Sequence, residues 1–294
     1  MKVLYLDCNM GAAGDMITAA LTELFENQDE IVEELNAMGV PGVEFVAETV
    51  DRGGIVGTHM SVRINGKEED GNWQVGDHEH HHDHEHHHHH DHDHHHDHHH
   101  DHDHDHEHHH HEHHHHDHDH HHEHTGMQDI EDIINSLNIG DSVKKNAMKV
   151  YSIIAEGESK AHGHPVTEVH FHEVGKMDAI ADVTAVCYLM EKLAPEKIMA
   201  STVAVGSGYV RCAHGILPVP APATANILLG IPIKAGIIPS ESCTPTGAAL
   251  LKHFVQDYSL PNDITIDKIG YGMGGRVFPG IAGGLRAMWG NLKE

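Results

Sequence analysis

The chain has 294 residues, of which 46 are acidic and 18 basic, and its formal net charge is −28. Residues 77–124 carry −15 of that charge and the other 246 residues carry −13. We therefore expect no nucleic acid and no anionic membrane surface as partner, because both are negatively charged. No apolar stretch approaches the roughly 20 residues that a membrane-spanning helix needs.

Strand-like and helix-like segments alternate along the chain, which predicts a mixed α/β globular body formed by residues 1–76 and 125–294. Apolar residues at helical spacing predict helices over 15–25 and 31–38, whereas β-rich composition predicts strands over 43–50 and 55–64. The other expected elements are a strand at 3–6, helices at 127–137, 143–162, 178–193, 223–229 and 246–255, strands at 166–172, 198–205 and 231–235, and a Gly-rich tail at 270–284.

Residues 77–124 consist of His, Asp and Glu alone, with 33 of the 40 histidines. Since no apolar residue interrupts them, we expect a long disordered insertion. Neutral imidazole binds nickel, zinc and copper, and carboxylates raise the local cation concentration, so the run from His78 to His124 predicts transition-metal binding. Two alternatives remain: a purification tag, which would be terminal and free of interleaved acids, and a solvated spacer without metal function.

The four cysteines Cys8, Cys187, Cys212 and Cys243 are far apart and form no Cys-x-x-Cys pair. Neither a disulfide framework nor a thiolate zinc site is indicated. Cys212 and His214, at i and i+2, are candidate metal ligands, although a lone cysteine is more often simply buried. No leader sequence precedes the first predicted strand, and the expected compartment is the cytoplasm.

The segment 169–175, Val-His-Phe-His-Glu-Val-Gly, is the clearest site signal outside the run. In a strand, residues i and i+2 share a face, so His170 and His172 would converge on one metal ion. Asp178 and Asp182 share one face of the next predicted helix. The structural alternative is that Asp178 caps this helix and that the histidines are hydrogen-bonded groups. Further candidate metal ligands just upstream are His162 and His164.

Residues 7–15 join the first predicted strand to the first predicted helix. Gly11 and Gly14 let backbone amides approach a ligand, and a helix N-terminus favours an anion such as phosphate. The Gly-Lys-Ser/Thr end of a P-loop is absent, so no nucleoside triphosphate site is indicated. Asp7 and Asp15 are alternatively a cation site, and the structural alternative is a tight turn with Asp15 as N-cap.

A second candidate anion site opens the predicted helix at 246–255. Thr244, Thr246 and Gly247 offer hydroxyls and amides that suit either helix capping or phosphate binding. The Gly-rich segment that ends at Arg276 is a weaker signal, because Gly-rich turns are common.

Four segments stand in a characteristic order along the chain. They are Gly14-Asp15-Met16, His170-Phe171-His172-Glu173-Val174-Gly175, His214-Gly215 followed by Leu217-Pro218-Val219-Pro220-Ala221-Pro222-Ala223-Thr224, and Thr244-Pro245-Thr246-Gly247-Ala248-Ala249. Together they resemble the LarC family of nickel insertion proteins. The resemblance extends from about residue 1 to residue 276, and a histidine-rich insertion is part of the family's pattern.

The resemblance implies a nickel chelatase, or cyclometallase, of the lyase class. Its substrate would be pyridinium-3,5-bisthiocarboxylic acid mononucleotide, and its product the nickel-pincer cofactor of lactate racemase-type enzymes, which has two Ni–S bonds and one Ni–C bond. Such enzymes use CTP with Mn²⁺ or Mg²⁺. In the family a CTP-binding domain follows the Gly-rich segment, so in a chain ending at Glu294 we expect that domain to be absent and supplied by a separate partner. We also expect a homo-oligomer.

The resemblance also implies roles for individual residues. Forming the Ni–C bond requires loss of a ring proton, for which Glu173, Asp178 or a neutral histidine would be the base. The substrate phosphate would bind at a helix N-terminus. The candidate cofactor-binding residues are Gly11, Gly14, Asp15, Thr244, Thr246 and Gly247, and the candidate nickel ligands are His162, His164, His170, His172, His214, Asp7 and the run. The alternative function is a non-enzymatic nickel store or metallochaperone that uses only the run.

Overall fold

The computed structural model describes residues 1–68, 125–169, 171, 174–212 and 215–293. Met1–Val75 and His124–Glu294 form one compact unit, and the elements below belong to it. The predicted metal-binding run at 77–124 lies outside the described residues.

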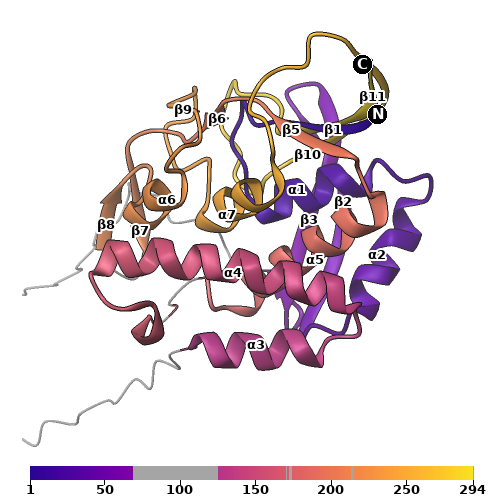
Figure 1. Ribbon diagram of the computed structural model, residues 1–294. Helices are drawn as coiled ribbons and strands as arrows, with labels where there is room; N and C mark the ends of the chain where they lie inside the picture. The colour runs from indigo at the N-terminus through magenta and orange to yellow at the C-terminus, as the bar shows by residue number, and fades with distance from the viewer. Residues whose placement is uncertain (69–124, 170, 172–173, 213–214, 294) are drawn as a thin grey trace, which may run out of the picture. The chain divides into compact units, whose positions relative to one another are not determined.

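A mixed sheet of seven strands forms one layer of this unit (Figure 1). Its strands are β1 (Lys2–Asp7), β2 (Val43–Arg52), β3 (Ile55–Ile64), β4 (Lys67–Glu68), β5 (Lys197–Ala200), β10 (Ile264–Gly272) and β11 (Leu285–Leu292). The order is β2-β3-β10-β11-β1-β5, with β4 paired to β3. Strand β1 runs parallel to β5, and β1 and β10 both run antiparallel to β11. The first and last described strands of the chain are therefore neighbours in the middle of the sheet.

Helices cover one face of the sheet in two layers (Figure 1). They are α1 (Gly14–Thr22), α2 (Gln28–Ala37), α3 (Met127–Ser136), α4 (Asp141–His162), α5 (Met177–Leu193), α6 (Pro222–Ile227) and α7 (Pro245–Phe254). Helix α1 packs on β3, β10 and β11 and against α5, and α4 packs outside them against α5, α6 and α7. Two small sheets, β6 (Val203–Ala204) with β9 (Ile233–Lys234) and β7 (Tyr209–Cys212) with β8 (Gly215–Pro218), complete the unit.

The inner position of α1 follows from its sequence. Of its nine residues all but Asp15 are buried, and Ile17 and Leu21 are almost completely so. A helix that is apolar all round must be covered on every side. In β1, Leu4 and Leu6 join the main core, whereas Val3 and Tyr5 join a smaller cluster that includes Met199. The sheet and α1 thus share one continuous core. No helix in the described part of the chain is long and apolar enough to cross a membrane.

The expected mixed α/β class is confirmed, and most expected helices begin and end within a few residues of the observed ones. The expected strand at 166–172 is wrong, because Val166–Glu168 form a short 3₁₀ helix. Local hydrogen bonds stabilise this 3₁₀ helix. The N–H of Glu168 donates to the carbonyl of Pro165, and the N–H of Val169 donates to the carbonyl of Val166. The segment 270–284, expected to be a Gly-rich tail, instead begins with the end of β10 and leads into β11.

Candidate functional site

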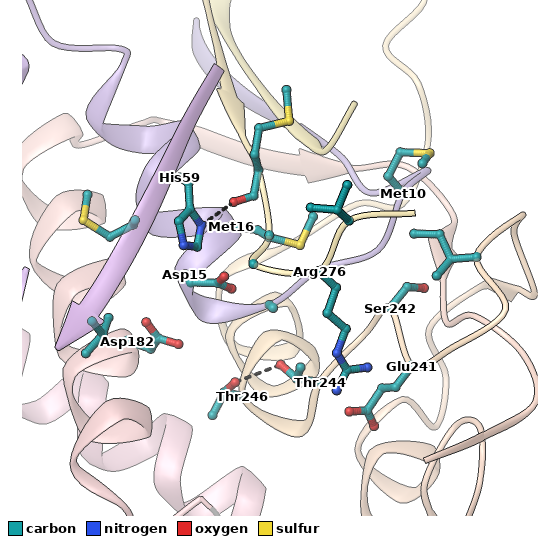
Figure 2. A pocket seen from close by; sticks show the side chains of 18 of the residues that line it. Met10, Asp15, Met16, His59, Asp182, Glu241, Ser242, Thr244, Thr246 and Arg276 are labelled. Atoms are coloured by element: carbon teal, nitrogen blue, oxygen red, sulfur yellow. Dashed lines mark hydrogen bonds between the residues drawn. The ribbon is translucent and has the colours of Figure 1, made fainter. Parts of the chain in front are cut away.

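A cavity of about 630 Å³ lies where the N-termini of α1, α5 and α7 converge (Figure 2). Its walls also include β3 and the loop that follows β10. Ligand cavities in proteins commonly have volumes of about 300–1,000 Å³. The lining residues that bear on its chemistry are Asp15, His59, Lys176, Asp178, Asp182, Thr244, Thr246 and Arg276.

The two sequence segments predicted to bind an anion meet at this cavity. The N–H of Ala12 donates to the carbonyl of Ser242 at 2.9 Å, and the N–H of Thr244 donates to the carbonyl of Ala12 at 3.1 Å. A Cβ on Gly11 would lie 1.9 Å from the carbonyl oxygen of Ser242, and one on Gly247 would lie 2.1 Å from that of Ala12. Both glycines thus permit a close approach of two backbones.

The N-terminus of α7 presents hydroxyl groups to the cavity. The Thr244 side chain accepts a hydrogen bond from the N–H of Gly247 at 3.1 Å and so caps the helix. The hydroxyls of Thr244 and Thr246 are 2.9 Å apart, as the dashed line in Figure 2 shows. Thr244 and Thr246 line the cavity, whereas Gly247 lies behind them against Ala12.

Three carboxyl groups lie together on another part of the wall. Asp15 opens α1, and Asp178 and Asp182 lie one turn apart on α5. Burial raises the pKa of Asp182 well above its usual range, and the charges of Asp15 and Asp178 raise it further. A hydrogen bond from the backbone N–H of Asp15 opposes this shift. Asp182 therefore holds a proton more tightly than an ordinary aspartate.

Beneath these acids lies Tyr151 of α4, which is fully buried. Its hydroxyl donates to the carbonyl of Val174 at 3.2 Å. Burial, followed by the charges of Asp178 and Asp182, raises the pKa of Tyr151 well above its usual value. The phenol consequently stays neutral and adds no negative charge to the acidic cluster.

Cationic and imidazole side chains come from elements that the sequence analysis did not select. Arg276, in the loop after β10, donates from Nη1 to the Ser240 hydroxyl at 2.8 Å. His59 of β3 is buried, and its Nδ1 lies 2.9 Å from the carbonyl oxygen of Met273. A lone histidine in a strand carries no sequence signal, whereas Arg276 had only the weak Gly-rich signal beside it. Figure 2 shows Arg276 on the α7 side of the cavity and Asp182 on the α5 side.

Several predicted metal ligands lie outside the described residues, namely His170, His172, His214 and the run to His124, and so does the predicted base Glu173. Val174, which follows the first of these segments in sequence, lines the cavity. His162 and His164 are described, at and beyond the C-terminus of α4, and neither lines it. Within the described ranges, no group of three or more His, Cys, Asp or Glu side chains is placed to hold a metal ion.

Asp7, another predicted metal ligand, is hydrogen-bonded to Arg286 and Asn9. Its carboxylate accepts hydrogen bonds from Nε of Arg286 at 3.0 Å and from Nη2 of the same side chain. The backbone N–H and the side-chain amide of Asn9 donate to its other oxygen. This carboxylate joins the end of β1 to β11 and does not line the cavity.

Comparison with known proteins identifies the family of the chain. A family model described as nickel insertion protein matches residues 4–294. The chain belongs to the nickel insertion protein family.

Two curated relatives are named pyridinium-3,5-bisthiocarboxylic acid mononucleotide nickel insertion protein. That of Clostridium acetobutylicum is 44% identical over 94% of this chain and 61% of its own length, and that of Clostridium kluyveri is 39% identical over 94% and 59%. The protein of the same name from Geobacillus kaustophilus is 34% identical over 99% and 60%. The chain thus spans about six tenths of the length of these relatives. No solved structure matches it.

Three of the four segments that resemble the nickel insertion family meet at the cavity. Asp15 and Met16 come from the first of them, Val174 from the second, and Thr244 and Thr246 from the fourth, and all five line the cavity wall. These segments are up to about 230 residues apart in sequence. Their convergence makes the cavity the candidate functional site of this family member.

Proposed function

We propose that this chain takes part in inserting nickel into pyridinium-3,5-bisthiocarboxylic acid mononucleotide, and that the reaction takes place in the cavity between α1, α5 and α7. The observation that carries the proposal is the convergence of the family's segments on a cavity of about 630 Å³. Storage of nickel by the run alone gains no support, since the family match extends over residues 4–294.

The charges of the cavity wall suit such a substrate. The phosphate would lie at the N-terminus of α7, near Thr244, Thr246 and Arg276, because hydroxyls, a guanidinium and the positive end of a helix dipole all stabilise a phosphate. The pyridinium ring carries a positive charge, and it would lie toward Asp178 and Asp182 of α5. Binding in this orientation would place the phosphate and the pyridinium charge against opposite charges of the protein.

Nickel is a substrate of this reaction and would reach the cavity from the histidines. The run would supply weak, exchangeable imidazoles, and His170 and His172 would pass the ion on. Both precede Val174, a cavity-lining residue, by four residues or fewer. We propose that Asp178 or Glu173 is the base that accepts the ring proton.

We also propose, from the family resemblance, that the reaction uses CTP with Mn²⁺ or Mg²⁺. The described residues of the cavity do not fit such a cation, because they include no group of three ligands placed to hold one. We therefore assign neither CTP nor its cation to this cavity.

The proposal is tested by mixing the purified protein with nickel, CTP, Mg²⁺ and the precursor and following the charge-transfer absorption of the nickel complex. The variant Arg276→Gln should raise KM for the precursor about 10- to 100-fold, as expected for loss of one charge-assisted contact. The control Arg63→Gln removes a half-exposed arginine that pairs with Glu48 at 2.8 Å, and it should behave as wild type. Equal KM values for the wild type and Arg276→Gln would contradict the proposed orientation.

A further inference from the structure

Asp182 has an unusual environment for a carboxyl group. A Cβ on Gly14 would lie 2.5 Å from its Oδ2, so this oxygen lies against the first turn of α1. There the side chain accepts the backbone N–H of Asp15. Its other oxygen, Oδ1, is buried and has no hydrogen-bond partner. A buried polar atom of this kind needs an explanation, since leaving it unpaired is costly.

Asp178 supplies that explanation. It precedes Asp182 by four residues on α5, so the two side chains share one helix face with Cβ atoms about 5–6 Å apart. Its Oδ1 is also buried. Two adjacent carboxylates cannot both remain charged at low cost, and a single proton between them turns repulsion into an O–H···O⁻ hydrogen bond.

The surroundings of the pair favour one retained proton. Asp15 on α1 adds a negative charge, and Tyr151 on α4 is neutral. From the other elements, His59 of β3 and Lys176, just before α5, also line the cavity, and Arg276 lies on its opposite side.

We propose that Asp178 and Asp182 share one proton and that this pair accepts the ring proton when nickel bonds to the ring carbon of the precursor. The inference rests on the proposed function. In this step the C–H bond breaks heterolytically, its electron pair forms the C–Ni bond, and the proton moves to the carboxylate pair. No oxidant or reductant is needed. Asp182, which the sequence analysis did not select as catalytic, becomes a catalytic residue alongside Asp178.

The shared proton is tested first, without nickel or precursor. Infrared spectra of the full chain at neutral pH should show the carbonyl stretch of one protonated carboxyl group, shifted in D₂O. Asp182→Asn should lose this band, as should Asp178→Asn, while the exposed control Asp132→Asn should keep it. In Asp182→Asn the asparagine still accepts the N–H of Asp15, so this contact with α1 is preserved, and thermal unfolding verifies the fold of each variant. A band that persists in Asp182→Asn and Asp178→Asn overturns the proposal.

The catalytic role is tested with precursor carrying hydrogen or deuterium at the ring carbon. Asp182→Asn should slow nickel insertion about 10²- to 10⁴-fold, with a larger isotope effect. Insertion at the wild-type rate by this variant overturns the proposal even if the infrared band is lost. If the wild type forms no nickel complex although its band is present, the proposed function fails, and with it the catalytic role of the pair.

Discussion

Gly14 and Asp182 lie so close together that a Cβ on Gly14 would come within 2.5 Å of the Asp182 carboxylate. The first turn of α1 is therefore fitted against a side chain of α5. This contact links the packing of the two helices to the environment of the acidic cluster, because the same carboxylate accepts the N–H of Asp15.

Gly14→Ala should lower the free energy of unfolding by about 1–3 kcal/mol, as overpacking in a core usually does. The better helix propensity of alanine, worth up to about 1 kcal/mol, would not offset the clash. The control is Gly275→Ala, whose Cβ would lie 3.6 Å from Cε1 of His59, an ordinary contact. Urea unfolding of both variants measures the difference, and equal midpoints would contradict the close contact.

Stability should depend on pH through Asp182. Its pKa is raised in the folded protein, so the folded state binds this proton more tightly than the unfolded state does. The favourable contribution is complete below the unfolded pKa of about 3.9 and is lost as the pH rises through the folded value. Asp182→Asn should therefore gain stability relative to the wild type as the pH rises. Unfolding measured from pH 5 to pH 9 tests this, and a constant difference would contradict it.

Asp7→Ala should lower the free energy of unfolding by about 1–3 kcal/mol, because it removes the buried carboxylate that accepts hydrogen bonds from Arg286 and so links β1 to β11. The partner Arg286 is half-exposed, which limits the loss. Asp263→Ala removes an exposed pair with Lys293 and should cost less than about 1 kcal/mol. Nickel titration should show the same stoichiometry for Asp7→Ala and wild type; a lower value would make Asp7 a nickel ligand.

The run at 77–124 should bind about eight to sixteen divalent ions, if each ion takes two to four of the 33 imidazoles. Affinity should be higher for copper than for nickel, and it should fall on acidification, because protons compete for the same nitrogens. Calorimetry on the wild type and on a variant lacking 77–124 measures the number of ions. The same nickel stoichiometry in both proteins would refute the prediction.

The sequence alone predicted the elements whose stability is local. Helix α5 and the hairpin of β2 and β3 follow from apolar periodicity and turn residues, and both are observed. The strand expected at 166–172 failed because Pro165 and the residues after it satisfy their hydrogen bonds within one turn. Strands β10 and β11 were not predicted, because their glycines weaken the strand pattern in the sequence. They also pair with strands far away in sequence, since β10 lies beside β3 and β11 beside β1, each more than 200 residues earlier.

Only the tertiary structure decided which residues form the site. The sequence selected Asp15, Asp178, Thr244 and Thr246 as separate candidates. A hydrogen bond between Ala12 and Thr244 and the packing of α5 on α1 bring their segments to one cavity. His59 was not selected, because neither its spacing nor its neighbours distinguish it. The physical reason is that the residue type determines which chemical groups a side chain has, whereas its burial and its charged neighbours depend on chain segments far away in sequence.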